Sequence, residues 1–130
     1  MANETILIVE DNEKNRKLAR DVLAFRGYKV IEAESAEAGL ELAWKSPPDL
    51  VLMDIQLPGM SGIEALGQLR GRESTRDIPV LAFTASVMLL DRHTITGAGF
   101  DGFLSKPIAI KELGDTIAAA LAKRGEKGGA

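Results

Sequence analysis

The chain has 130 residues, of which 45% are apolar and 27% are charged, so its size and composition suit one globular domain. A net charge of −3, the lack of cysteine and a single histidine, His93, argue against a nucleic-acid binder, a disulfide scaffold, a cysteine nucleophile and a Cys/His zinc site. No apolar run approaches the roughly 18 residues of a membrane span, and residues 1–5 lack the basic segment of a signal peptide, so we expect a soluble cytoplasmic domain.

The first strand and helix are expected near the N-terminus. Ile6–Val9 is an unbroken, mostly β-branched apolar run, which is typical of a strand buried on both faces. Asp11 or Asn12 can cap the helix that follows, and Gly27 stands where a helix commonly ends. Between these signals three apolar residues recur at helical spacing, namely Leu18, Val22 and Phe25.

A second strand and helix, and then a third strand, come next. We expect a strand over Tyr28–Ala33 and a helix over Ala36–Lys45. The helix must end before Pro47-Pro48, because proline lacks an N–H and disfavours α geometry in the residue before it. Leu50–Met53 is the most uniformly apolar run and is expected to be the third strand.

The second half of the chain continues the alternation. A helix is expected over Ser61–Arg70, because its first residues have the Ser-x-x-Glu form of a capping box. Val80–Phe83 reads as the fourth strand and is followed by a helical pattern over Ser86–Ala98. The fifth strand is expected over Asp101–Ser105, before Pro107 interrupts it.

The last helix carries four apolar residues on one face, namely Ile110, Leu113, Ile117 and Leu121. Residues 125–130 include three glycines and are expected to form a flexible tail, so the domain should span residues 1–124. Five successive βα units predict an α/β fold, with a doubly wound, five-stranded parallel sheet covered by helices on both faces. The alternation alone leaves the strand order open.

Five polar residues follow the apolar runs, where a parallel sheet places its ligand crevice. They are Glu10, Asp11, Asp54, Thr84 and Lys106. If the first and third strands are neighbours, the three carboxylates converge, and their oxygens suit a hard cation such as Mg²⁺. The hydroxyl and the ammonium group would complete a site for a phosphoryl group. Taken singly, each residue could be a cap, a turn residue or a surface lysine, but their joint occurrence after four strands indicates a site.

Four segments carry a resemblance to a known family. They are Ile6–Asn12, Asp49–Gly62, Pro79–Ala85 and Gly102–Pro107. In these segments, and over about residues 5–123, the chain closely resembles the receiver domain of bacterial two-component response regulators, which has the CheY-like fold. The resemblance implies a flavodoxin-like three-layer sandwich with strand order 2-1-3-4-5, which makes the first and third strands neighbours.

The resemblance also implies a phosphoacceptor and a metal site. Asp54 would accept the phosphoryl group, and Glu10 and Asp11 would hold Mg²⁺. Asp54 itself and the backbone carbonyl of Gln56 would also reach the metal. A carboxylate that attacks phosphorus forms an acyl phosphate, which is a case of nucleophilic catalysis.

Three further residues receive roles from the resemblance. Thr84 would hydrogen-bond the phosphoryl oxygens, and Lys106 would pair with them. Thr84 and Phe103 would form the switch that responds to phosphorylation, although Phe103 could equally be a plain core residue. The Lys106-Pro107 peptide bond would be cis, which is rare enough in proteins to be a structural device.

The implied function is a phosphorylation-dependent signalling switch that is not a conventional enzyme. Its donor would be a histidine kinase or a histidine phosphotransfer protein. Its downstream target would be a protein that binds the face formed by the fourth helix, the fifth strand and the fifth helix, where Val87–Leu90 adds apolar residues. No direct contact with nucleic acid or membrane is expected. The chain could instead be a receiver excised from a larger response regulator or hybrid kinase, or a phosphorelay intermediate.

Other classes fit the residues less well. A haloacid-dehalogenase-type phosphatase has Asp-x-Asp after its first strand, where this chain has Glu10-Asp11. A serine hydrolase is disfavoured because Gly59–Gly62 is not Gly-x-Ser-x-Gly, and His93 is expected at the surface. A degenerate receiver used only for binding is disfavoured because all five site residues are present.

Overall fold

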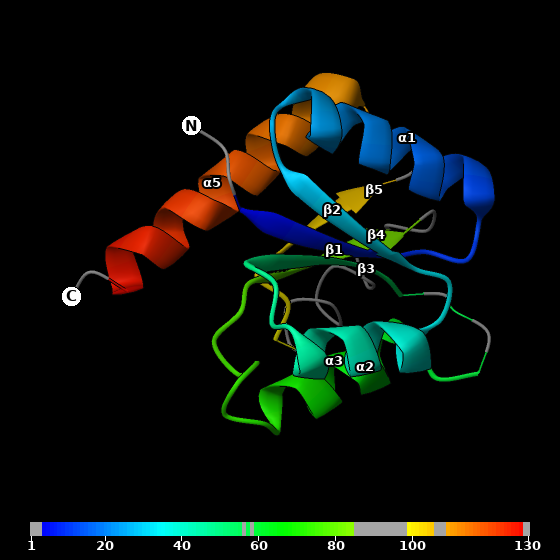
Figure 1. The fold of residues 1–130 in the computed structure, drawn as a ribbon, viewed down its shortest axis with the longest axis vertical. Helices are drawn as coiled ribbons and strands as arrows, with labels where there is room; N and C mark the ends of the chain where they lie inside the picture. The colour runs from blue at the N-terminus through cyan, green and yellow to red at the C-terminus, as the bar shows by residue number, and fades with distance from the viewer. Residues whose placement is uncertain (1–3, 56, 58, 85–98, 106–108, 129–130) are drawn as a thin grey trace.

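The structure, a computed structural model, describes residues 4–55, 57, 59–84, 99–105 and 109–128. In these residues five strands form one parallel sheet, and four helices pack against it (Figure 1). The elements are β1 (Thr5–Val9), α1 (Glu13–Phe25), β2 (Lys29–Ala33), α2 (Ala36–Lys45), β3 (Leu50–Asp54), α3 (Gly62–Arg70), β4 (Val80–Thr84), β5 (Gly102–Ser105) and α5 (Ile110–Gly128). The strand order is β2-β1-β3-β4-β5, which confirms the expected order and the flavodoxin-like fold.

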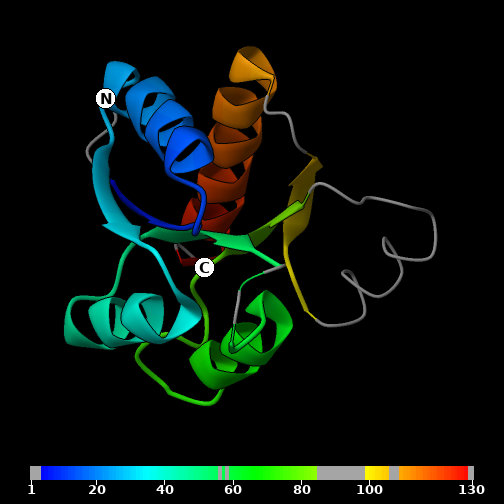
Figure 2. The same cartoon turned by 90° about the vertical axis from the view of Figure 1, so that its right-hand side faces the viewer.

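The sheet lies between two helical layers. Helices α1 and α5 cover one face, and α2 and α3 cover the other (Figures 1 and 2). Successive strand residues point to opposite faces, so Ile6 and Ile8 pack toward α1 and α5, while Leu7 and Val9 pack toward α2 and α3. This burial on both faces explains why the strands are continuous apolar runs rather than alternating ones.

Side-chain caps set the starts of three helices. The side chains of Asn12, Ser35 and Ser61 accept hydrogen bonds from backbone N–H groups three residues later, at 3.0, 3.1 and 3.2 Å. The sequence signals for the starts of α1 and α3 are therefore confirmed. At the end of α1, Gly27 has φ 94°, a left-handed conformation that glycine adopts without steric cost.

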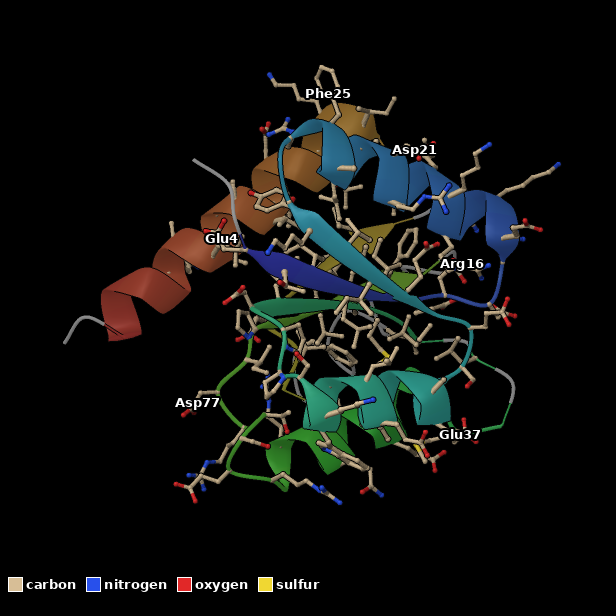
Figure 3. The ribbon with its side chains drawn as sticks, in the orientation of Figure 1. Glu4, Arg16, Asp21, Phe25, Glu37 and Asp77 are labelled. Atoms are coloured by element: carbon tan, nitrogen blue, oxygen red, sulfur yellow. The ribbon has the colours of Figure 1, made fainter. Side chains whose placement is uncertain are left out.

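The three apolar residues at helical spacing in α1 do not all lie on its buried face. Leu18 is 36% exposed and Phe25 is 93% exposed, and Phe25 points away from the body of the protein (Figure 3). The buried residues are instead Ala19, Val22 and Leu23, because the helix turns this stripe toward the sheet. Of the three apolar residues at helical spacing, only Val22 is buried.

The last helix also differs at both ends from the expectation. Ile110 is 59% exposed, whereas Leu113 and Ile117 are fully buried against the sheet. Helix α5 continues to Gly128, so residues expected to form a flexible tail after position 124 are largely helical. Lys123, Arg124, Glu126 and Lys127 are favourable helix formers, which outweigh the glycine at 125. The helix expected over Ser86–Ala98 lies outside the described residues.

Candidate functional site

The register of the sheet brings two acidic residues together. Strands β1 and β3 are parallel neighbours, and Val9 lies opposite Met53. Glu10 directly follows Val9 and Asp54 directly follows Met53, so the two acidic residues lie side by side at the same edge of the sheet. Both are buried, with 0% and 2% of their surface exposed, whereas Asp11 is exposed. The convergence predicted from the sequence is thus confirmed for all three carboxylates.

The three carboxylates form a compact acidic cluster. One oxygen from each of Glu10, Asp11 and Asp54 lies within 4.8 Å of the others. Two unit charges about 4 Å apart repel by about 4 kcal/mol at an effective dielectric constant of 20. A cation with oxygen ligands would remove this repulsion, and Mg²⁺ commonly binds one or two carboxylates together with water and phosphate oxygens. The donor set therefore fits a hard divalent cation.

Backbone contacts hold the turn that carries two of the acids. The N–H of Glu10 donates to the carbonyl of Ala33 on β2 at 3.0 Å, and the N–H of Asn12 donates to Oε2 of Glu10 at 3.2 Å. The guanidinium of Arg16 donates to the carbonyl of Glu10 at 2.9 Å. Sequence reasoning gave Arg16 no role in the site. The sequence feature that could have indicated a role was the position of Arg16 near the start of a helix that directly follows the acidic pair Glu10-Asp11.

The segment that carries Asp54 is fixed by the start of α3. Asp54 lies opposite Phe83 of β4, and the N–H of Ile55 donates to the carbonyl of Phe83 at 3.3 Å. The N–H of Gly62 donates to the carbonyl of Ile55 at 3.0 Å. Gly62 is buried against the backbone of residues 54 and 55, which leaves no room for a Cβ atom.

Of the remaining candidate residues, Phe103 and the backbone of Thr84 are described, and Gln56 and Lys106 are not. Thr84 ends β4 and lies opposite Ser105 in the sheet register, so its backbone is at the same edge as the acidic cluster. Gln56 and Lys106 are outside the described residues, and their roles stay predictions. Phe103 is on β5, opposite Ala82 of β4. It is partly buried and packs against the core on the α2–α3 side.

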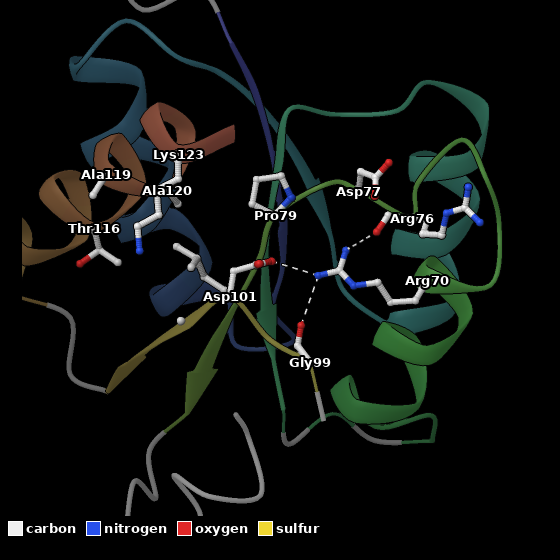
Figure 4. A pocket seen from close by; sticks show the side chains of 12 residues that line it. Arg70, Arg76, Asp77, Pro79, Gly99, Asp101, Thr116, Ala119, Ala120 and Lys123 are labelled. Carbon is white, nitrogen blue, oxygen red and sulfur yellow. Dashed lines mark hydrogen bonds and ion pairs between the residues drawn. The ribbon is translucent and has the colours of Figure 1, made fainter. Parts of the chain in front are cut away.

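A separate cleft of about 940 Å³ opens at the other end of the sheet, between the starts of β4 and β5 and the second half of α5 (Figure 4). Arg70 crosses its wall and donates to the carbonyls of Arg76 and Ile78, at 2.8 and 2.6 Å. It also donates to Asp101 at 2.9 Å. The cleft shares no lining residue with the acidic cluster. The bond between Arg70 and Asp101 in its wall joins the end of α3 to the start of β5.

The family model described as "Response regulator receiver domain" matches residues 6–118. The chain belongs to the response regulator receiver domain family. It is 43% identical over 118 residues to the polar-differentiation response regulator DivK of Brucella ovis, which covers 91% of this chain and 96% of that protein. Receiver domains of this family act in two-component signal transduction.

Solved structures give the same result for the fold. A CheY-like receiver domain protein from Methanospirillum hungatei superposes with a TM-score of 0.88 at 27% identity, covering 97% of this chain and 99% of that chain. The chemotaxis protein CheY4 of Vibrio cholerae has a TM-score of 0.86 at 25% identity, covering 92% and 99%. Within the described residues, no helix combines the length and apolar content that crossing a bilayer requires.

Proposed function

We propose that this receiver domain is a phosphorylation-dependent switch that takes a phosphoryl group onto Asp54. The donor is a phosphohistidine on a histidine kinase or a histidine phosphotransfer protein. The observation that carries the proposal is the buried carboxylate of Asp54, held within 4.8 Å of the carboxylates of Glu10 and Asp11. Membership of the receiver family supports the same conclusion.

Glu10, Asp11 and Asp54 would hold a Mg²⁺ ion, and the backbone carbonyl of Gln56 would add a fourth protein ligand. When bound, the ion would offset the negative charge that the acidic cluster shares with the incoming phosphoryl group. All-oxygen ligands with two buried carboxylates match the preference of this ion.

The reaction is a displacement at phosphorus. A carboxylate oxygen of Asp54 forms a bond to phosphorus as the phosphorus–nitrogen bond of the phosphohistidine breaks, and the electron pair stays on the imidazole nitrogen, which takes up a proton. The product is an acyl phosphate. Lys106 would pair with the phosphoryl oxygens, and Thr84 would hydrogen-bond them. Beyond its own phosphorylation and dephosphorylation the domain would catalyse no reaction.

The signal would leave through protein contacts. The proposed output face comprises the helix expected over Ser86–Ala98, β5 and α5, and the partly buried Phe103 on β5 would respond by repacking. Phenylalanine has no hydroxyl, so the response of Phe103 itself would rest on packing and not on a new hydrogen bond. Shifting such an equilibrium from 1:99 to 99:1 requires about 5.5 kcal/mol of differential stabilisation. A few charge-assisted hydrogen bonds of about 1.5–3 kcal/mol each would suffice.

The test is phosphorylation by phosphoramidate, which contains the same phosphorus–nitrogen bond, followed by intact mass measurement. The wild-type chain should gain one phosphoryl group in the presence of Mg²⁺, and hydroxylamine should remove it, as expected of an acyl phosphate. Asp54→Asn should gain none, and Asp11→Asn should need more Mg²⁺. The control is Asp21→Asn, because Asp21 is an exposed α1 carboxylate paired with Arg20. Equal labelling of Asp54→Asn and wild type would refute the assignment.

A further inference from the structure

Arg16 joins the acidic turn to the edge strand of the sheet. Its side chain is 12% exposed, and it projects from α1 beside the ends of β1 and β2 (Figure 3). One guanidinium nitrogen donates to the carbonyl of Glu10 at 2.9 Å. The other nitrogens lie 3.3 Å from Glu32 and 3.4 Å from Glu34, both on the β2 side. A single planar group thus binds one backbone carbonyl and two carboxylates.

These contacts anchor the backbone of Glu10. The N–H of Glu10 is bonded to Ala33, and its carbonyl is bonded to Arg16. The backbone N–H of Arg16 also donates to the carbonyl of Asn12 at 2.9 Å, as the first intrahelical bond of α1. Because Glu10 and Asp11 lie in the acidic turn, Arg16 restricts where their carboxylates can point.

Arg20 provides a natural comparison on the same helix. It lies 3.2 Å from Glu32 and 3.4 Å from Asp21, so it also ties α1 to β2. Among its contacts in the described part of the chain, none is to the turn of residues 10–12. Arg16 and Arg20 thus share the role of docking α1 on β2, but only Arg16 touches a residue of the acidic cluster.

Charge and geometry make opposite predictions for Arg16. A positive charge near a cation site repels the cation, so removing it should tighten Mg²⁺ binding if charge alone matters. If Arg16 orders the turn, removing it should weaken Mg²⁺ binding, because the carboxylates must then be ordered at the moment of binding. The sign of the change therefore separates the two roles.

We propose that Arg16 is a positioning residue that orders the Glu10–Asn12 turn for divalent-cation binding. This inference rests on the proposed function, because it takes the acidic cluster to be a Mg²⁺ site. Groups that orient metal ligands from outside the ligand set typically change metal affinity by about 10–100-fold when mutated. Arg16 acts on the backbone of a ligand residue, so an effect at the lower end of that range is expected.

The experiment measures the Mg²⁺ dissociation constant by amide NMR, together with the urea midpoint of each variant. Methionine keeps the apolar stem of arginine but has no donor, so Arg16→Met and Arg20→Met form a matched pair. Arg16→Met should bind Mg²⁺ about tenfold more weakly than wild type. Arg20→Met should stay within about twofold of wild type, even if both variants lose similar stability.

Two results would overturn the inference. Arg16→Met could bind Mg²⁺ as tightly as wild type or more tightly, or Arg20→Met could weaken binding equally. If Arg16→Met does not fold, Arg16→Lys replaces it, because lysine keeps the charge but cannot serve three acceptors with a planar fork. It should bind at least threefold more weakly, and wild-type affinity would overturn the inference. A wild-type chain that binds no Mg²⁺ would overturn the proposed function and this inference with it.

Discussion

Gly62 is the position where adding one methyl group should do most harm near the site. It is the first residue of α3, and its backbone packs directly on the end of β3. A Cβ at this position would press on the carbonyl oxygen of Asp54 and would lie 2.8 Å from Cα of Ile55. Neither atom can rotate away, because both belong to the backbone. Gly62→Ala must therefore push α3 away from the segment that carries Asp54.

The magnitude follows from two opposing effects. Ordinary contact of a Cβ begins near 3.4 Å, so the backbone of Ile55 must retreat by about 0.6 Å, and overpacking of this kind costs about 1–3 kcal/mol. The upper end applies because the neighbours are rigid. Alanine gains up to about 1 kcal/mol over glycine in a helix, so the net loss should be about 2 kcal/mol. With a urea m-value of about 2 kcal/mol/M, the unfolding midpoint should fall by about 1 M.

Gly67 is the matched control in the same helix. A Cβ at this position has no atom of the described residues within 4 Å, so Gly67→Ala should stabilise the protein by about 0.5–1 kcal/mol. Urea unfolding followed by circular dichroism measures both variants. If Gly62→Ala were as stable as wild type or Gly67→Ala, the close packing of α3 on β3 would be refuted.

Three further variants test other parts of the fold. Ser61→Ala removes the cap of α3 and should cost about 1 kcal/mol of unfolding free energy in urea; no loss would contradict the cap. Arg70→Met removes the guanidinium from Asp101, which keeps the N–H of Val80 as a donor, and from several backbone carbonyls; it should cost about 1–3 kcal/mol, measured as a lower urea midpoint, whereas an unchanged midpoint would contradict the network. Burial raises the pKa of Tyr28, and the nearby Glu4 raises it further. The folded state therefore keeps the phenol proton to higher pH than the unfolded state, so this contribution is complete below about pH 10 and is lost as pH rises above it. The stability of wild type relative to Tyr28→Phe should fall over that range, and a constant difference would contradict the shift.

The sequence predicted the site better than it predicted the helix surfaces. The meeting of Glu10 and Asp54 follows from a general property, because parallel strands end at the same edge of a sheet. It also required β1 and β3 to be neighbours, and only the family resemblance supplied that order. Periodicity distinguishes strands from helices but carries no information on which strands pair.

The exposure of Phe25 and the contacts of Arg16 depend on tertiary packing that sequence patterns do not predict. Phe25 is exposed because α1 lies on the sheet through a stripe centred on Ala19, Val22 and Leu23, and spacing alone cannot select between adjacent stripes. Arg16 reaches Glu10 across the turn between β1 and α1, and it reaches Glu32 because α1 packs on β2. Long side chains have several possible acceptors, so the place of Arg16 near the start of α1 was a signal that did not single out Glu10 as its acceptor.

The central claim is that three carboxylates form a cation-dependent phosphoryl site at the end of β1 and β3. The most direct test is an amide NMR titration with beryllofluoride, a mimic of the phosphoryl group, with and without Mg²⁺. The account predicts shifts at residues 10–12 and 51–55 only when Mg²⁺ is present, and no such shifts in Asp54→Asn. Identical shifts in wild type and Asp54→Asn, or shifts that do not require Mg²⁺, would contradict it.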